Sequence, residues 1–222
     1  MKEPDSDLKA IIFDLDGVIV DTAKYHYLAW RELANQLGFD FTTEQNERLK
    51  GVSRVRSLEI LLDIGKVHLE EDQKTKYLKE KNEQYLQYIA KMDHSEILPG
   101  IDDLLHYLKL NKVPFSLGSA SKNARLILET LDLIDLFDVI VDGNDVSTAK
   151  PDPEVFLIAA KKLGVPPEDC IVIEDAQAGI EAANKAGMTS IGIGDATILH
   201  EADFMLSNTS ELTIDFIQKL IA

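Results

Sequence analysis

Two aspartates stand where a buried strand is expected to end. Asp14 and Asp16 follow the apolar run 10–13, with only Leu15 between them and Gly17 directly after. Carboxylates beside a core are unfavourable unless a cation pairs with them. One carboxylate of such a pair can attack phosphorus while the other moves the proton of the entering or leaving hydroxyl. The alternative is a polar strand end with a helix cap, and the close pair before a glycine turn favours chemistry.

A second pair of acids, Glu174 and Asp175, ends another apolar run and precedes a helical pattern. Mg²⁺ binds one or two carboxylates together with waters and phosphate oxygens, so these acids could complete a metal site with Asp14. Adjacent acids before a helix are also common as capping residues, because carboxylates are favourable at helix N-termini. The two acid pairs together favour the metal site.

A serine and a lysine could handle phosphate. Ser119 ends the run "VPFSLGS" and, with the backbone amides after it, could bind a phosphoryl group. Lys150 precedes a proline, which favours an extended backbone, and its ammonium could neutralise phosphoryl charge in the transition state. Alone, a loop serine or a surface lysine is usually only solvated, so both depend on the rest of the pattern.

All these residues occupy one kind of place in the expected fold. Apolar runs that end in polar residues cover 10–16, 113–121, 137–145 and 170–176, and helical periodicity covers 124–133, 153–164 and 178–187. Strands alternating with helices indicate a parallel sheet covered on both faces, and ligands bind outside the carboxyl ends of its strands. The sequence therefore predicts an α/β fold with a doubly wound, Rossmann-like parallel sheet.

One region breaks the alternation of strands and helices. Residues 22–95 carry helical patterns and no convincing strand. We therefore expect an inserted α-helical cap domain over 22–95, with the α/β core domain formed by 1–21 and 96–222.

Composition and charge restrict the class of protein. The chain has 222 residues, of which 45% are hydrophobic and 28% charged, as in globular domains. A net charge of −16 predicts no binding to nucleic acid or anionic membranes, and it requires any phosphate site to be a local basic pocket.

The remaining sequence signals are negative. The single Cys170 excludes a disulfide framework or a cysteine-based zinc site, and the five histidines show no paired ligand spacing. The acidic residues 1–7 are unlike a signal peptide, and no apolar run approaches membrane-spanning length. We expect a reduced, cytoplasmic protein, and its charge and composition fit a monomer.

In this order, "DLDGVIVDT", a strand ending in Ser119, "KPDP" and "IEDAQAG" resemble the motifs of the haloacid dehalogenase-like phosphotransferases. The resemblance spans most of the chain. It implies that Asp14 is a nucleophile that becomes an aspartyl phosphate and that Asp16 is the general acid/base. It also implies that Asp14, the backbone carbonyl of Asp16 and Asp175 hold Mg²⁺, with Glu174 nearby. The dehalogenases of the family lack the second aspartate, so Asp16 favours phosphoryl transfer.

The cap carries two groups of polar residues whose roles are open. His26 lies one turn after Thr22 on the face that carries Trp30, where packing is the commoner role of a histidine and Trp30 is expected in the core. Lys50 and Arg54 flank a turn before a helix with an expected N-cap at Ser53, which suits an anion or an ordinary helix start.

Two further segments also permit two interpretations. The residues after Ser119 could grip a second phosphate across the cleft from Arg54, or they could form a capping turn. Lys81 lies in a highly charged helical segment, where a solvated lysine is the default.

Together these cap and loop segments resemble the sugar phosphomutases of the same family, which interconvert β-glucose 1-phosphate and glucose 6-phosphate through β-glucose 1,6-bisphosphate. By this resemblance Arg54 with 121–123 holds the non-reacting phosphate, while His26 and Lys81 link substrate binding to Asp16. The expected substrate-binding residues are Thr22, His26, Lys50, Gly51, Arg54, Ser57, Lys81, Ser119, Ala120, Ser121, Lys122, Asn123 and Lys150.

Two other functions remain open at this point. The first is a sugar-phosphate phosphatase with the same core, for which the cap residues would be incidental. The second is a phospho-accepting receiver domain, which the length of the chain and the inserted cap disfavour.

Overall fold

A computed structural model of the chain describes residues 9–221. The acidic N-terminal residues 1–7, predicted not to be a signal peptide, lie outside the described residues. None of the helices within 9–221 combines the length and the apolar character needed to cross a membrane.

Six parallel strands form one sheet in the order β3-β2-β1-β4-β5-β6. Their bounds are β1 Ala10–Phe13, β2 Phe115–Gly118, β3 Val139–Val141, β4 Cys170–Glu174, β5 Thr189–Ile193 and β6 Phe204–Leu206. The central strands β1 and β4 are fully buried, as expected for continuous apolar runs in a parallel sheet. The strands β5 and β6 were not predicted.

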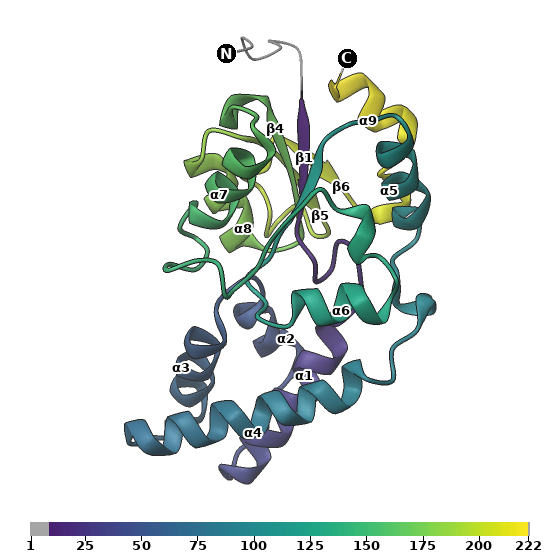
Figure 1. Cartoon of the computed structure of the whole chain (residues 1–222). Coiled ribbons are helices and arrows are strands. Elements are labelled where there is room, and N and C mark those ends of the chain that lie inside the picture. The colour runs from purple at the N-terminus through teal and green to yellow at the C-terminus, as the bar shows by residue number, and fades with distance from the viewer. Residues whose placement is uncertain (1–8, 222) are drawn as a thin grey trace.

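Helices cover both faces of the sheet (Figure 1). The helices are α1 Ala23–Gln36, α2 Thr43–Asn46, α3 Arg54–Gly65, α4 Glu71–Ile89, α5 Ile101–Leu110, α6 Ala124–Thr130, α7 Glu154–Leu163, α8 Gln177–Lys185 and α9 Ile214–Ile221. Alternate residues of β1 point to opposite faces: Ile11 and Phe13 pack with residues of α5, α6 and α9, whereas Ile12 packs with α7 and α8. The predicted doubly wound α/β fold is confirmed.

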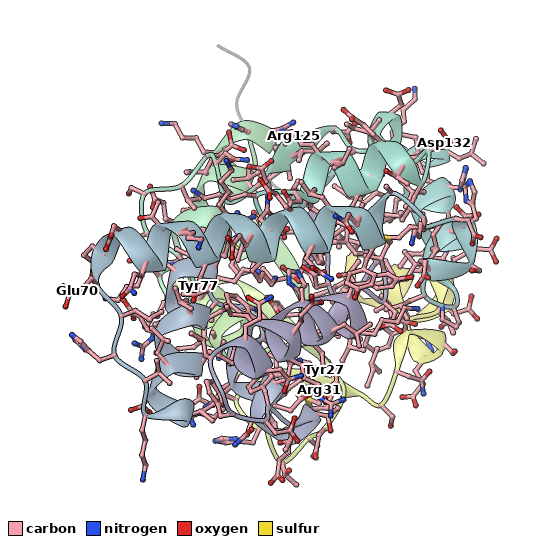
Figure 2. All side chains as sticks on the ribbon, turned by 90° about the horizontal axis from the view of Figure 1, so that it is seen from below. Tyr27, Arg31, Glu70, Tyr77, Arg125 and Asp132 are labelled. Carbon is pink, nitrogen blue, oxygen red and sulfur yellow. The ribbon has the colours of Figure 1, made fainter. Side chains whose placement is uncertain are left out.

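The helices α1 to α4 lie together beyond the carboxyl ends of the strands (Figure 1). Trp30, Leu33, Phe41, Leu58 and Leu61 form a hydrophobic cluster of their own there. The C-terminal part of α4 instead contributes Tyr85 and Ile89 to the cluster on the face of the sheet that α5, α6 and α9 cover. Seen from below, α4 runs from Glu70 across the molecule, with α1 on one side and α6 on the other (Figure 2). The precise boundaries 22–95 of a cap domain stay a prediction.

The chain leaves and re-enters the sheet region at neighbouring points. The backbone N–H of Asp21 donates to the carbonyl of Glu96 at 3.0 Å, and Val20 forms an isolated antiparallel bridge with Ile97. The two connections to the helical layer therefore run side by side.

Candidate active site

A buried lysine joins the two acidic strand ends. Asp14 directly follows β1, and Glu174 is the last residue of β4. Lys150, from the segment between β3 and α7, places its Nζ 2.6 Å from Oδ1 of Asp14 and 2.7 Å from Oε1 of Glu174. All three side chains are buried, so one cation faces two carboxylates in a medium of low dielectric constant.

The surrounding charges shift the pKa values of these groups. Burial raises the pKa of Asp14 to about 7; Lys150 opposes this shift, and Glu174 and Asp16 add to it. Burial alone would lower the pKa of Lys150, but the carboxylates of Asp14 and Glu174 raise it above its usual value. Burial, followed by the charge of Glu174, raises the pKa of Asp175 well above its usual range. The site therefore holds more negative charge than Lys150 balances.

The donor set fits Mg²⁺. One carboxylate oxygen from each of Asp14, Glu174 and Asp175 lies within 4.8 Å of the others. Hard oxygen ligands with surplus negative charge are what Mg²⁺ prefers. Gly17 has a φ of 78°, and a Cβ there would lie 2.1 Å from Oδ2 of Asp175, so the glycine is needed for this close approach. The predicted contribution of the Asp16 backbone carbonyl to the metal site stays a prediction.

On the opposite side of the site, cap residues reach toward Asp16. The Nζ of Lys81 lies 2.9 Å from Nδ1 of His26, whose Nε2 lies 4.0 Å from Oδ1 of Asp16. The ring of His26 stacks on Tyr85 with centroids 4.0 Å apart, and the ammonium of Lys81 lies over Trp30 and Tyr85. Lys81 is only 4% exposed, which excludes the solvated lysine that its helix would suggest.

Electrostatics in this group favour uncharged side chains. Burial, with help from Arg54, lowers the pKa of Lys81 to about 7, although Asp16 opposes the shift. Burial and the charges of Lys81 and Arg54 keep the pKa of His26 well below its usual value. Burial raises the pKa of Asp16 to about 7, against the attraction of Lys81. A neutral His26 can accept a hydrogen bond from Lys81 at Nδ1 and present its Nε2–H towards Asp16.

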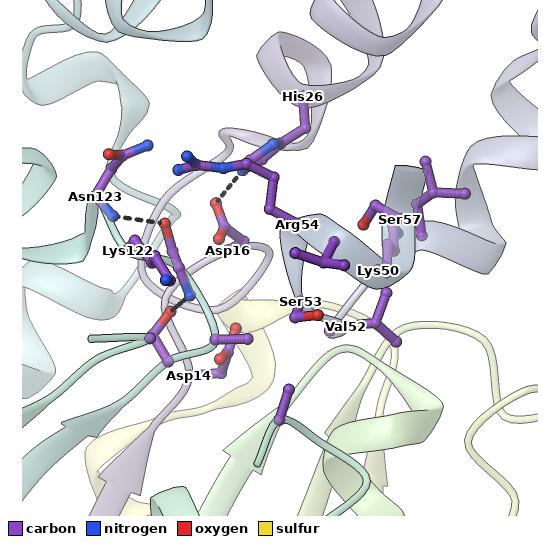
Figure 3. A pocket seen from close by; sticks show the side chains of 18 of the residues that line it. Asp14, Asp16, His26, Lys50, Val52, Ser53, Arg54, Ser57, Lys122 and Asn123 are labelled. Carbon is purple, nitrogen blue, oxygen red and sulfur yellow. Dashed lines mark hydrogen bonds and ion pairs between the residues drawn. The ribbon is translucent and has the colours of Figure 1, made fainter. Parts of the chain in front are cut away.

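A cavity of about 440 Å³ separates the sheet from the helical layer. Figure 3 shows His26 and Arg54 reaching into it from the cap, with Lys122 and Asn123 on the core side. The predicted site residues that line it are Asp14, Asp16, His26, Lys50, Gly51, Arg54, Ser57, Lys81, Ser119, Ala120, Ser121, Lys122, Asn123 and Asp175. Three predicted residues, Thr22, Lys150 and Glu174, are buried and do not line it. Lys150 and Glu174 support Asp14 from behind.

The loop after β2 is held in place by hydroxyls and by the neighbouring loop. Ser119 Oγ accepts a hydrogen bond from the N–H of Ser121, and Ser121 Oγ accepts one from the N–H of Asn123. The N–H of Gly143 and the side chain of Asn144 donate to carbonyls of the same loop. The loop is therefore preorganised at the cavity wall.

Lys81 faces aromatic rings and His26, and two further basic residues that line the cavity have no carboxylate partner among the described residues. Arg54 and Lys122 form no ion pair with any residue in the described range 9–221. Burial lowers the pKa of Arg54, but a guanidinium remains charged at neutral pH. In a chain of net charge −16, unpaired cations at one cavity mark a place for an anion.

The cap touches the core closely at a second point. Lys50 places its Nζ 3.7 Å from Oδ2 of Asp175 and 3.0 Å from Oε2 of Glu47. Gly51 has a φ of 70°, and a Cβ there would lie 2.7 Å from the Cβ of Ala176. The helical layer is thus closed over the acidic cluster.

Several residues that line the cavity, Trp30 and Asn46 among them, were not predicted as site residues. Trp30 is buried, as predicted, but it also lines the cavity. Asn46 lines it as well, is 7% exposed, and its Oδ1 has no hydrogen-bond partner within 9–221. An asparagine in a polar helical segment gives no signal of this kind; only its closeness to Lys50 in the sequence could have drawn attention to it.

The model of a family described as haloacid dehalogenase-like hydrolases matches residues 8–187, and the chain belongs to this family. The β-phosphoglucomutase of Bacillus subtilis (strain 168) is 44% identical over 96% of this chain and 95% of the relative. The crystal structure of a β-phosphoglucomutase from Clostridium difficile superposes with a TM-score of 0.92 at 45% identity, covering 96% of this chain and 97% of that one. A "phosphorylated carbohydrates phosphatase" of Thermotoga maritima is 33% identical over 83% of this chain and 84% of the relative.

Proposed function

We propose that this chain interconverts β-glucose 1-phosphate and glucose 6-phosphate through β-glucose 1,6-bisphosphate, as an Mg²⁺-dependent phosphomutase of its family. The observation that carries the proposal is the pair of unpartnered cations, Arg54 and Lys122, in the same cavity as Asp14. A mutase must hold a second phosphate while the first one reacts, whereas a phosphatase needs only one transfer site and a water. The similarity to two β-phosphoglucomutases supports the same assignment.

In the first half-reaction a carboxylate oxygen of Asp14 attacks the phosphorus of one phosphate of the bisphosphate. The bond from phosphorus to the sugar oxygen breaks, and Asp16 donates its proton to that oxygen. In the return direction a sugar hydroxyl attacks the aspartyl phosphate, Asp16 takes the hydroxyl proton, and the carboxylate of Asp14 is restored. Lys150 stays beside Asp14 throughout and attracts the negative charge of the phosphoryl oxygens.

Asp14 and Asp175, with Glu174 beside them, would hold the Mg²⁺. When bound, the ion supplies positive charge to the phosphoryl oxygens and reduces the repulsion that an approaching phosphate meets from the acidic cluster.

The two ends of the cavity have different tasks in this proposal. Ser119, Ala120 and Lys150 serve the reacting phosphoryl group, and Arg54 with Ser121, Lys122 and Asn123 holds the other phosphate. Lys50, Gly51 and Ser57 face the sugar from the cap. After the aspartyl phosphate has transferred its phosphoryl group to β-glucose 1-phosphate, the resulting bisphosphate reorients, so that each phosphate occupies each end in turn. The buried Thr22 is assigned to the start of α1, where the cap leaves the core.

A sugar-phosphate phosphatase is the second candidate, because a carbohydrate phosphatase is also among the relatives. It would use the same Asp14 and Asp16 and would leave Arg54 without a purpose. A cytoplasmic location and a monomeric state stay predictions.

The deciding experiment supplies β-glucose 1-phosphate, Mg²⁺ and a trace of β-glucose 1,6-bisphosphate, and follows glucose 6-phosphate and free phosphate together. We expect glucose 6-phosphate to form much faster than phosphate. Release of phosphate without glucose 6-phosphate would replace the mutase with the phosphatase.

The variant Arg54→Ala tests the second phosphate grip. We expect it to lose mutase turnover by roughly 10²-fold, since charge-assisted hydrogen bonds to an anion disappear. Its hydrolysis of a small aryl phosphate, which has no second phosphate, should fall much less. Equal losses for the two reactions would exclude the assigned role of Arg54.

A further inference from the structure

One hydrogen bond crosses from the helical layer to the loop after β2, and its residue on the cap side is not one of the predicted site residues. The Nδ2 of Asn123 donates to Oδ1 of Asn82 at 2.9 Å, and the contact is partly buried. Asn82 belongs to α4, and Asn123 precedes α6. The two helices lie beside each other in the view from below (Figure 2).

Asn82 directly follows Lys81 in α4. The preceding residue, Lys81, contacts His26 at 2.9 Å, and His26 in turn faces Asp16. Consecutive residues of an α-helix are separated by 1.5 Å along its axis and have a fixed relative direction. A single turn of α4 therefore touches both the group that leads to Asp16 and the loop at the other end of the cavity.

The amide of Asn123 has a second N–H beyond the one that bonds Asn82. Asn123 lines the cavity, and its backbone N–H is already taken by Ser121 Oγ. With the amide held by Asn82, its nitrogen is fixed in place, and the second N–H, which has no acceptor within residues 9–221, can donate to an anion. If the amide turned over, its oxygen would take the position of the nitrogen and would repel a phosphate.

We propose that Asn82 is a positioning residue: it orients the Asn123 amide for the non-reacting phosphate and thereby ties the occupancy of that phosphate site to α4 and Lys81. The proposal rests on the proposed function. Its consequence is that a sugar phosphate gripped at Asn123 stabilises the position of α4 in which Lys81 and His26 reach Asp16. A water molecule alone does not bind at Asn123 in this way. Asp16 is therefore brought together with His26 and Lys81 when a sugar phosphate is bound, and not for hydrolysis.

The kinetic test is a double-mutant cycle of Asn82→Ala and Asn123→Ala, measured as kcat/KM for β-glucose 1-phosphate. We expect Asn82→Ala to lose roughly tenfold, the size expected for one hydrogen bond to an anion-binding group. In the Asn123→Ala background the same change should have almost no further effect, because Asn82 acts through Asn123. Additive losses would overturn the proposal, since they would mean that Asn82 acts elsewhere.

Glu83→Ala is the matched control, because Glu83 is exposed on the same turn of α4. We expect Glu83→Ala to retain the wild-type kcat/KM. A loss equal to that of Asn82→Ala would show that the loss in Asn82→Ala comes from a general disturbance of α4. Melting temperatures are compared for all variants. If Asn82→Ala proves too unstable, Asn82→Ser replaces it, because the serine hydroxyl is too short to reach Asn123.

A binding experiment separates this inference from the proposed function. In an Asp14→Asn background, which cannot turn over, calorimetry measures the Kd of glucose 6-phosphate with and without Asn82→Ala. We expect a roughly tenfold weaker Kd for the double variant. An unchanged Kd would overturn the role of Asn82, whereas a wild-type enzyme that forms no glucose 6-phosphate would overturn only the mutase assignment.

Discussion

Lys150 resolves the question that the acidic strand ends raise. Its single ammonium contacts both Asp14 and Glu174, so the carboxylates at the ends of β1 and β4 share one counterion inside the protein. Among residues 9–221, Asp175 has no comparable buried cation, and its one ion-pair partner is Lys50 of the cap, at 3.7 Å. At the scale of single residues, Lys150 thus neutralises part of the negative charge from the core side, and the remaining charge is left for a cation that binds from the cavity side.

The variant Asp14→Asn is expected to abolish phosphoryl transfer, because an amide is a poor nucleophile for phosphorus. The fold should persist, since Lys150 keeps its contact with Glu174 and the substitution removes one of the crowded negative charges. Acid-quenched enzyme treated with labelled substrate should carry label in the wild type and none in the variant. Labelled Asp14→Asn protein would move the nucleophile to another residue.

The low pKa of Lys81 should be visible in the pH dependence of the free energy of unfolding. Its folded-state pKa of about 7 lies below the ordinary value of 10.5, so between these pH values the unfolded chain binds more protons than the folded one. The free energy of unfolding of the wild type, relative to Lys81→Met, should therefore rise with pH above 7, by at most about 1.4 kcal/mol per pH unit. Urea unfolding at pH 7, 8 and 9 measures the difference.

The exposed Lys79 on the same helix supplies the control for that experiment. Lys79→Met removes a lysine from the solvent-exposed face of the same helix, so any pH dependence that appears only with Lys81→Met belongs to the buried position. A pH-independent difference for Lys81→Met would show that the folded protein carries a charged Lys81 throughout.

At the scale of elements, residue patterns predicted the strand ends, whereas the cap side of the site was predicted only through the resemblance to the family. Continuous apolar runs such as 170–174 identified the buried strands, and the polar residues after them marked the active edge. A threonine, a serine and a glycine interrupt the apolar residues of β5, and the apolar run of the partly exposed edge strand β6 is only three residues long. His26 and Lys81 are 55 residues apart, and no local pattern reports that two helices bring them within 2.9 Å.

The turn at Gly51 offers a test of the contact between cap and core. Gly51→Ala should cost about 1 kcal/mol for its positive φ, and its Cβ would also collide with Ala176. We expect kcat/KM to fall by tenfold or more, because the cap can no longer close over the acidic cluster. The measurement is steady-state turnover with β-glucose 1-phosphate.

Gly38→Ala is the matched control for this prediction. Gly38 also has a positive φ, of 91°, but a Cβ there would meet no atom within 4 Å. Gly38→Ala should lose similar stability and keep its turnover. If both variants lose turnover equally, backbone strain and not cap closure is the cause.

At the scale of the whole molecule, the chain is so acidic that a bound divalent cation should increase the free energy of unfolding. The net charge is −16, and three of the negative groups converge on the cluster of Asp14, Glu174 and Asp175. A cation that binds the folded state alone stabilises it by mass action. The protein should therefore be more stable with Mg²⁺ than after treatment with a chelator.

Mg²⁺ at 100 times its Kd should add about 2.7 kcal/mol to the free energy of unfolding. Asp175→Asn should remove most of this gain, and it should also stabilise the metal-free protein by relieving repulsion. Thermal unfolding at constant ionic strength, with and without chelator, measures both effects. Asp63→Asn, at an exposed position outside the cluster, should retain the full gain; a gain that survives Asp175→Asn would place the ion elsewhere.

The paired connections at Asp21 and Glu96 also bear on how such a molecule can change over evolutionary time. The helices α1 to α4 begin and end at adjacent points in space. The sheet is therefore joined to them by two neighbouring connections, whose positions do not depend on the length or sequence of the helices. The helical layer can therefore diverge, lengthen or be exchanged while the strand order and the aspartate chemistry remain. On this basis a chimaera that receives the helices of a relative at these two points should fold, and it should inherit the donor's choice of sugar.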